Sequence, residues 1–402
     1  MSRLRLISIV CFIFVFSWMR MSGQQKLRLI PTFENCSYYC DSVFDVTFDK
    51  AWNTSDVFRL LYKAKNESQW CEAFPPYYDI QRFQLRGSIM NLKENTEYDV
   101  RLEKKRKNKW ITAKKGDFVT WNSCPPIKRE WKLSELKEYK VGSGVVLKGM
   151  KGRADGWIKI IGDVPIEVSS TYRQALEVDD CRYLILENFV VKGGKIDAVA
   201  IRENCENVRI VGADISAWGR VAVDQVHLED SINYPAVKYK RDNACFIDEE
   251  GVVIRNDAGI YLGTVGKVPG PKDIVVERCY IHDPNGHSNA WHGTREIGRA
   301  KGIPYRFWHP QGPQGIYMRS RGGLVIRYND VVGMDHHRLH DLLGGFNNGK
   351  IDGGMNTDAD VYGNYLAFSQ DDGLEMDGGQ CNIRLYNNRI EQVRVGISTA
   401  PN

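Results

Sequence analysis

The chain reads Glu177-Val178-Asp179-Asp180-Cys181-Arg182-Tyr183-Leu184-Ile185-Leu186, and 24 residues later it reads Ile201-Arg202-Glu203-Asn204-Cys205-Glu206-Asn207-Val208-Arg209-Ile210. The same frame returns at 274–281, 324–331, 359–366 and 383–390. A unit of this length with short strands of period two cannot bury its apolar side chains alone. Coils stacked about 4.8 Å apart can bury them against one another. The repeat therefore predicts an all-β solenoid.

One corner of the repeat carries a polar residue at a fixed position. Asn188, Asn329, Asn364 and Asn388 lie there, and Gly212 and Cys279 replace them in two coils. We expect the asparagine side chains to bond from coil to coil. This pattern resembles the right-handed parallel β-helix of the pectin-lyase-like superfamily, and the resemblance covers roughly residues 140–402. We assign 139–402 to this fold. Cys181 and Cys205 occupy equivalent positions and are expected to stack as free thiols.

The first 23 residues have the pattern of a secretory signal peptide. Arg3 and Arg5 precede an apolar stretch over 6–18, which Ser22-Gly23 follows. No other segment is long and apolar enough to cross a bilayer. Removing the signal lowers the formal charge from +5 to +2, which argues against nucleic acid as a partner. We expect a secreted, periplasmic or cell-surface protein, in which Cys36, Cys40, Cys71 and Cys124 are candidates for disulfides.

Residues 24–122 alternate short apolar strands with turns, which indicates a small β-sandwich before the solenoid. The run 90–102, with Leu92, Thr96 and Tyr98, resembles a strand of fibronectin type III domains in which the tyrosine hydroxyl ties the strand to the preceding corner. Residues 123–138 contain Pro125 and Pro126 and are predicted to be a linker. The chain stops just after the strand 395–398 with no recognisable cap, so we expect a fragment of a longer protein.

Aligning the strands that begin at Gly259, Gly315, Gly373 and Gly396 predicts the position of a site. Alternation along these strands points Tyr317 and Glu375 outward, with Arg319 and Asp377 two residues further on. In the same register His340 stacks on Asp371 and Arg394, and Asp341 stacks on Asp372. The predicted catalytic patch contains His340, Asp341, Asp371, Asp372 and Glu375.

The segment Gln370-Asp371-Asp372-Gly373-Leu374 resembles the Gly-Asp-Asp-Cys-Ile segment of polygalacturonase-type hydrolases. That resemblance implies inverting hydrolysis, in which one carboxylic acid protonates the leaving oxygen and a carboxylate activates water. Asp341 would match the family's aspartate one coil earlier. Insertions at 217–256, at 284–312 and at 333–340 with 344–358 would wall the groove. Trp291, Trp308 and His309 in the second of them would contact sugar rings beside Tyr317, Arg319, Asp377 and Arg394.

Three functions remain open at this point: a glycoside hydrolase of an acidic or substituted polysaccharide, a polysaccharide lyase, and a non-catalytic glycan-binding surface protein. A lyase would use calcium or an arginine, with His340, His337 or Arg394 as the base. No cofactor is required for the hydrolase, but calcium is possible at Asp352, Asp358, Asp360 or the Asp371-Asp372 pair. We expect a monomer whose partner is a polysaccharide.

Overall fold

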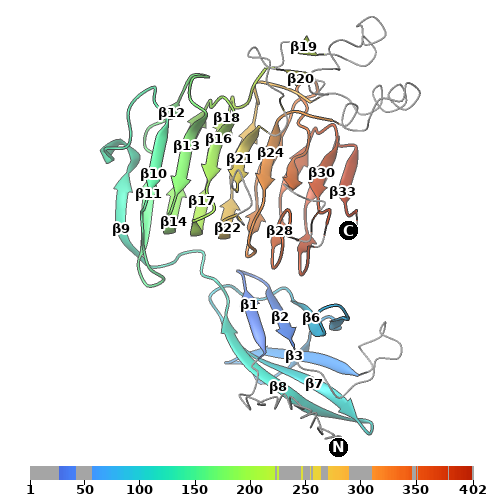
Figure 1. The fold of residues 1–402 in the computed structure, drawn as a ribbon. Coiled ribbons are helices and arrows are strands. Elements are labelled where there is room, and N and C mark those ends of the chain that lie inside the picture. Colours follow the sequence, from blue (N-terminus) through green and yellow to red (C-terminus); the bar gives the residue numbers. More distant parts are fainter. Residues whose placement is uncertain are drawn as a thin grey trace, which may run out of the picture.

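A computed structural model gives the fold of residues 27–41, 57–221, 224–225, 246–247, 254, 257–263, 270–288, 310–345, 350, 352–378 and 380–400. Its regular structure is almost entirely β-strand, apart from a single turn of 3-10 helix, η1 (Leu133–Glu135), in the described part. A small sandwich lies below a longer solenoid in Figure 1. The predicted signal peptide lies outside the described residues.

The sandwich consists of two antiparallel four-stranded sheets. One contains β1 (Arg28–Pro31), β2 (Cys36–Cys40), β6 (Gln84–Ile89) and β5 (Tyr77–Asp79), and the other β4 (Cys71–Glu72), β3 (Phe58–Ala64), β7 (Glu97–Arg106) and β8 (Lys109–Val119). Buried apolar side chains from both sheets form its core. The Tyr98 hydroxyl accepts a hydrogen bond from the backbone N–H of Lys93 at 2.8 Å, so the tyrosine ties its strand to the preceding corner.

The solenoid consists of three parallel sheets. The site sheet contains β10 (Val145–Lys148), β13 (Gln174–Asp179), β16 (Asp197–Ile201), β21 (Ala258–Leu262), β24 (Gln314–Met318), β27 (Leu343–Gly345), β30 (Asp372–Glu375) and β33 (Val395–Ser398). The interface sheet contains β9 (Ile127–Lys132), β11 (Trp157–Ile161), β14 (Arg182–Glu187), β17 (Glu206–Val211), β22 (Lys272–Glu277), β25 (Val325–Arg327), β28 (Asp360–Tyr362) and β31 (Arg384–Tyr386). The third sheet contains β12 (Ile166–Glu167), β15 (Val190–Lys192), β18 (Asp214–Ser216), β23 (Tyr280–His282), β26 (Asp330–Val332), β29 (Tyr365–Ala367) and β32 (Arg389–Glu391). Two short antiparallel strands, β19 (Asp224–Gln225) and β20 (Phe246–Ile247), lie apart from the three sheets.

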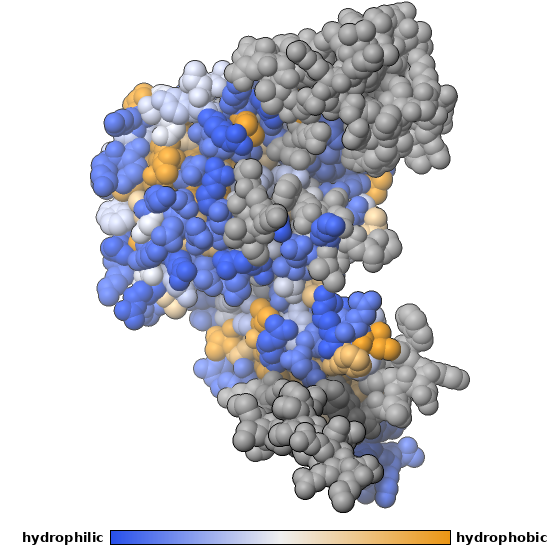
Figure 2. All heavy atoms as spheres, in the orientation of Figure 1, coloured by the Kyte–Doolittle hydropathy of each residue, from blue (hydrophilic) through white to orange (hydrophobic). Residues whose placement is uncertain are grey.

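Each coil contributes one strand to each of these sheets, so the prediction of a parallel β-helix preceded by a small β-sandwich is confirmed. Equivalent apolar residues stack along the axis. In the site sheet, Ile260, Ile316, Leu343 and Leu374 are register partners in successive coils, and all four are fully buried. Figure 2 shows that hydrophilic residues dominate the visible face of the solenoid, while apolar residues gather on the sandwich.

The predicted asparagine ladder is present over the last coils. Asn364 Oδ1 accepts from Asn329 Nδ2 at 2.9 Å, and Asn388 Oδ1 accepts from Asn364 Nδ2 at 2.9 Å. The backbone N–H of Cys279 donates to Asn329 Oδ1 at 2.9 Å, which extends the ladder by one coil. These bonds satisfy buried polar groups at a corner where the backbone turns away from the sheets.

The cysteines in the described residues are free thiols. Cys181 and Cys205 each donate to a backbone carbonyl in the core, which confirms the expected stacking without a bridge. The four cysteines that were candidates for disulfides are not bridged. Cys36 and Cys40 lie at opposite ends of one strand, where their side chains cannot meet, and Cys71 and Cys124 are separately exposed.

The segment 123–138, predicted to be a linker, instead supplies the first strand of the interface sheet. Strand β9 pairs in parallel with β11, with Arg129 opposite Ile158 and Trp131 opposite Ile160. The sandwich contacts the same sheet further along. Phe33 is buried with Val275, Val325 and Tyr362 of the solenoid. The two parts are therefore joined by an extended sheet and by a shared core.

Polar contacts surround that shared core. Asp360 accepts a hydrogen bond from Thr32 of the sandwich and also pairs with Arg384, whose guanidinium reaches Ser37 at 2.6 Å. Asp358 accepts a hydrogen bond from the hydroxyl of Tyr39 at 2.5 Å. No helix in the described part of the chain has the length and apolar character that spanning a membrane requires.

Candidate active site

The predicted catalytic residues lie together at the start of two neighbouring strands of the site sheet. His340 and Asp341 lie just before β27, and Asp371 lies just before β30, which begins with Asp372. The backbone N–H of Asp371 donates to the carbonyl of His340 at 3.0 Å. The backbone N–H of Asp372 donates to Asp341 Oδ1 at 3.0 Å. The structure therefore places His340 beside Asp371 and Asp341 beside Asp372, as the repeat register predicts.

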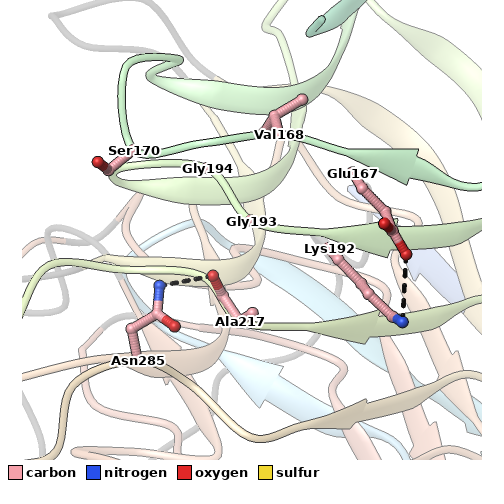
Figure 3. Close-up of a pocket in the computed structure, with 8 residues that line it drawn as sticks. All are labelled: Glu167, Val168, Ser170, Lys192, Gly193, Gly194, Ala217 and Asn285. Carbon is pink, nitrogen blue, oxygen red and sulfur yellow. Dashed lines mark hydrogen bonds and ion pairs between the residues drawn. The ribbon is translucent and has the colours of Figure 1, made fainter. Parts of the chain in front are cut away.

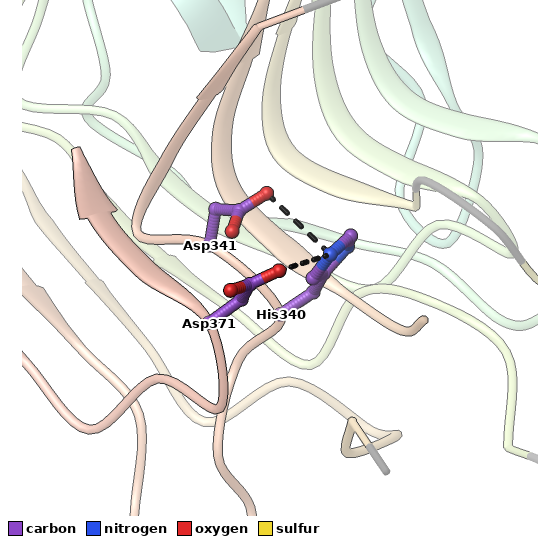
Figure 4. A group of neighbouring side chains, drawn as sticks. All are labelled: His340, Asp341 and Asp371. Atoms are coloured by element: carbon purple, nitrogen blue, oxygen red, sulfur yellow. Dashed lines mark ion pairs between the residues drawn. The ribbon is translucent and has the colours of Figure 1, made fainter. Parts of the chain in front are cut away.

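The imidazole of His340 faces two carboxylates. Its Nε2 lies 3.7 Å from Asp341 Oδ2 and 3.7 Å from Asp371 Oδ2, as Figure 4 shows. His340, Asp341, Asp371 and Asp372 are each no more than 6% exposed. Glu375 is less buried, and its Oε2 accepts the backbone N–H of Gly345 at 2.8 Å. We call these five residues, His340, Asp341, Asp371, Asp372 and Glu375, the acid cluster.

Burial and crowding of like charges keep protons on the acid cluster. Burial raises the pKa of Asp372 to about 9, and the carboxylates of Asp341, Asp371 and Glu375 add to the effect. Burial, together with the charge of Asp341, raises the pKa of Glu375 to about 8. Burial also raises the pKa of Asp341, although His340 opposes it. Burial lowers the pKa of His340, but Asp341 and Asp371 outweigh it and raise that pKa to about 9.

This arrangement offers a proton donor and proton acceptors at neutral pH. The groups that act on the pKa of Asp372 all favour its protonated form, so it can donate a proton. His340 Nε2 lies 3.7 Å from both Asp341 and Asp371, and the imidazole opposes the effect of burial on the pKa of Asp341. A carboxylic acid and carboxylates thus lie on neighbouring coils of one face.

Gln314 belongs to the same group, although the sequence analysis did not select it. It is 1% exposed, and its Nε2 lies 2.9 Å from Nδ1 of His340. The signal was available, because Gln314 precedes Ile316 by two residues just as Asp341 precedes Leu343 and Asp372 precedes Leu374. Since those three apolar residues are register partners, the polar residues before them share one column.

The predicted binding residues differ in their surroundings. Tyr317 is 7% exposed, and its ring centroid lies 6.1 Å from that of Tyr261 in the preceding coil. Arg319 pairs with Asp352 at 3.1 Å. The backbone N–H of Arg394 donates to the carbonyl of Asp371 at 3.2 Å, which places this residue one coil beyond the acid cluster.

Asp377 holds the end of the described chain rather than the centre of the site. Its Oδ1 accepts the hydroxyl of Ser398 at 2.6 Å and the backbone N–H of Ala400 at 2.7 Å. Trp291, Trp308 and His309, the predicted sugar contacts of the insertion, lie outside the described residues.

One group in the described part of the chain has a spacing suited to a cation. Ligand-type atoms of His340, Asp341 and Asp371 lie within 4.8 Å of one another. The other acids considered for calcium have partners elsewhere: Asp358 and Asp360 lie in the contact with the sandwich, and Asp352 pairs with Arg319.

A separate cavity of about 340 Å³ opens on the same edge of the solenoid, several coils earlier. Figure 3 shows its lining, which includes Glu167, Lys192, Ala217 and Asn285. Glu167 pairs with Lys192 at 3.3 Å, and Asn285 Nδ2 donates to the carbonyl of Ala217 at 2.7 Å. This cavity brings no two carboxyl groups together, so the acid cluster is the better candidate for acid and base chemistry.

No protein-family model and no curated protein matches the chain. Among solved structures, the chain is similar to a family 28 exopolygalacturonase of Yersinia enterocolitica, with 10% identity and a TM-score of 0.25 over 94% of this chain and 71% of that one. It is also similar to the catalytic domain of a GH87 alpha-1,3-glucanase in complex with nigerose, with 9% identity and a TM-score of 0.18 over 92% of this chain and 91% of that one.

Proposed function

We propose that the protein is an exported glycoside hydrolase that cleaves an acidic or substituted polysaccharide by carboxylate acid and base catalysis. The observation that carries the proposal is the acid cluster, in which Asp372, with its raised pKa, lies one coil from Asp341 and beside Asp371, the two carboxyl groups that face His340. Hydrolysis of a glycosidic bond uses one protonated and one ionised carboxyl group that flank the bond.

Asp372 is assigned the role of the general acid, because its surroundings keep it protonated at neutral pH. It would donate its proton to the leaving glycosidic oxygen. Asp341 and Asp371 are assigned the role of base, because His340 lies 3.7 Å from both and stabilises their negative charge. One of them would take a proton from water as the water attacks the anomeric carbon, with inversion as the expected outcome. Glu375, three residues further along the same strand, raises the pKa of Asp372.

The surroundings of the acid cluster suit a glycan chain. Tyr261, which is partly exposed beside the buried Tyr317, offers an aromatic ring on which a sugar face would stack. We assign Tyr317, Arg319 and Arg394 to substrate binding, together with Trp291, Trp308 and His309 of the insertion. We also assign Asp377 to substrate binding, at the margin of this surface.

The remaining parts of the proposal concern the whole chain. The segment 1–23 would direct export to the periplasm, the cell surface or the medium. The sandwich, with its tyrosine bonded to the preceding corner, would be a fibronectin type III-like domain. The hydrolase would act as a monomer on a polysaccharide and would need no cofactor.

A polysaccharide lyase is the second candidate, and one observation favours it. The spacing of His340, Asp341 and Asp371 would suit a cation such as calcium, which could neutralise a uronate carboxylate. With His340 holding the cation, His337 or Arg394 would then remove the proton alpha to that carboxylate; without a cation, His340 would be a third candidate for this base. The product would carry a double bond, whereas a hydrolase product gains water.

The test is incubation of the protein with a panel of plant and algal polysaccharides, with and without chelator, following reducing ends and ultraviolet absorbance together. New reducing ends without absorbance, reduced by about 10²–10⁴-fold in Asp372→Asn, would support the hydrolase. Asp335→Asn, an exposed acid that pairs with Arg338, is the matched control and should leave activity unchanged. Absorbance that the chelator abolishes would establish the lyase, and retained glycan binding without any product would indicate a binding protein.

A further inference from the structure

The Gln314 side chain contacts the histidine of the acid cluster. Its Nε2 lies 2.9 Å from Nδ1 of His340, and the amide lowers the pKa of Asp341. It reaches the ring from β24, the strand of the preceding coil, and it is almost completely buried. A buried amide is held in one place by its packing, so it can fix the ring that it touches.

Gly344 leaves the space that Gln314 occupies. A Cβ on Gly344 would lie 2.1 Å from Oε1 of Gln314 and 3.1 Å from Oδ2 of Asp341, and the first distance is shorter than real contacts allow. The equivalent positions in the adjacent coils carry large side chains, Tyr317 and Glu375. The φ angle of Gly344 lies outside the left-handed region, so its backbone does not require glycine. The absence of a side chain there therefore serves the packing of Gln314.

We propose that Gln314 is a positioning residue of the acid cluster: lying in the space left by Gly344, it holds the His340 ring with its Nε2 edge toward Asp341 and Asp371. The catalytic role of Gln314 rests on the proposed function, whereas its contact with the His340 ring is a property of the protein without substrate.

The physical reason is the near symmetry of an imidazole ring. A rotation of 180° about the bond to the ring exchanges nitrogen and carbon positions with little change in shape. A hydrogen bond at Nδ1 distinguishes the two orientations, because a carbon in that place could not make it. With Nδ1 held by Gln314, Nε2 faces both carboxylates at 3.7 Å. Without that bond the ring can turn a carbon toward them, and the two acids lose contact with the Nε2 edge of the ring.

Three variants test the proposal. Gln314→Leu removes the amide at similar size, Gly344→Ala leaves Gln314 in the sequence but displaces its side chain, and the double variant combines them. Gln174→Leu is the matched control, because Gln174 bonds Asp197 at 3.1 Å in the register of an earlier coil. The imidazole nitrogen resonances of His340 are recorded by NMR without substrate, and kcat and KM are measured on the polysaccharide that the wild type cleaves.

We expect both single variants to change the His340 resonances in the same way, and Gln174→Leu to leave them unchanged. We expect kcat to fall by about 10–100-fold while KM changes little, because support of a catalytic group is lost rather than a substrate contact. The double variant should be no worse than Gln314→Leu, since both changes remove one interaction.

Unchanged His340 resonances in folded Gln314→Leu would overturn the proposal, as would multiplicative effects of the two single changes. If Gln314→Leu fails to fold, Gly344→Ala alone decides, because it retains the glutamine. If the wild type cleaves no polysaccharide, the proposed function fails, while the NMR comparison still tests the positioning role.

Discussion

The guanidinium of Arg327 lies 3.7 Å from the ring centroid of Phe33, so a charged side chain of the solenoid covers an aromatic ring of the sandwich. Both side chains are buried, and Arg327 also bonds Glu94 of the sandwich at 2.7 Å. A cation over a ring away from water contributes more than it would at an exposed site. Through this contact the sandwich covers part of the interface sheet of the solenoid.

Phe33→Ala should destabilise the contact between the two parts. Removing a buried phenylalanine costs about 3–5 kcal/mol, and here the loss falls on the shared core. Thermal unfolding followed by circular dichroism should shift to lower temperature and separate into two transitions. Phe74→Ala, at a site that is 66% exposed, is the control and should unfold like the wild type. A single unshifted transition in Phe33→Ala would show that the contact contributes little.

Asn364→Ala should weaken the last coils. Asn364 accepts from Asn329 and donates to Asn388 and to the carbonyl of Ile326, so its loss leaves buried polar groups unpaired. Each such group costs about 1–3 kcal/mol, and we expect the free energy of unfolding to fall by about 3 kcal/mol. Denaturant unfolding measures the change, with exposed Asn66→Ala as the control. Equal stability of the two variants would contradict a structural role for the ladder.

The activity of the proposed hydrolase should depend on a proton of Asp372. Because the pKa of Asp372 is raised to about 9, the acid form is lost as the pH rises through that value, and kcat/KM should fall above it. Glu375→Gln removes a negative charge that raises this pKa, so the alkaline limb should move to lower pH. Asp335→Asn should not move it. An alkaline limb unaffected by Glu375→Gln would assign the proton to another group.

Stability should also depend on pH through Asp197. Burial raises the pKa of Asp197 to about 7 against an ordinary value of 3.8, although its bond from Gln174 opposes the shift. The folded protein therefore keeps a proton that the unfolded chain releases above about pH 4, and this contribution of about 4 kcal/mol is lost as the pH rises to about 7. Asp197→Asn should remove that part of the pH dependence, measured as the free energy of unfolding at about pH 5 and about pH 8. Exposed Asp155→Asn should retain the slope of the wild type.

The repeat made the solenoid and its register predictable. Asn364 and Asn388 are 24 residues apart, so they lie at equivalent corners of successive coils. Alignment of the glycines that begin the strands places Asp341 beside Asp372. Both follow from periodicity, which a sequence displays directly. The alternation of strand residues likewise predicted the sandwich, whereas the tie made by Tyr98 was predicted by a resemblance to one strand of fibronectin type III domains.

Other features depend on contacts between distant segments, which no local pattern reveals. Nothing around Thr32 indicates that it bonds Asp360, and two prolines suggested a linker where β9 joins a sheet. Gln314 was missed because an uncharged amide does not suggest catalysis on its own. The clue was its position two residues before Ile316, which is the buried register partner of Leu343.

The contact between Thr32 and Asp360 spans 328 residues of sequence, which has a consequence for synthesis. At about 5–20 residues per second, a ribosome that has completed the sandwich at about residue 122 needs roughly 12–48 s more to reach Asp360. During that interval the aromatic face around Phe33 has no solenoid to cover it. Newly made chains therefore pass through a period in which a chaperone, or another nascent chain, can reach a surface that the finished protein conceals.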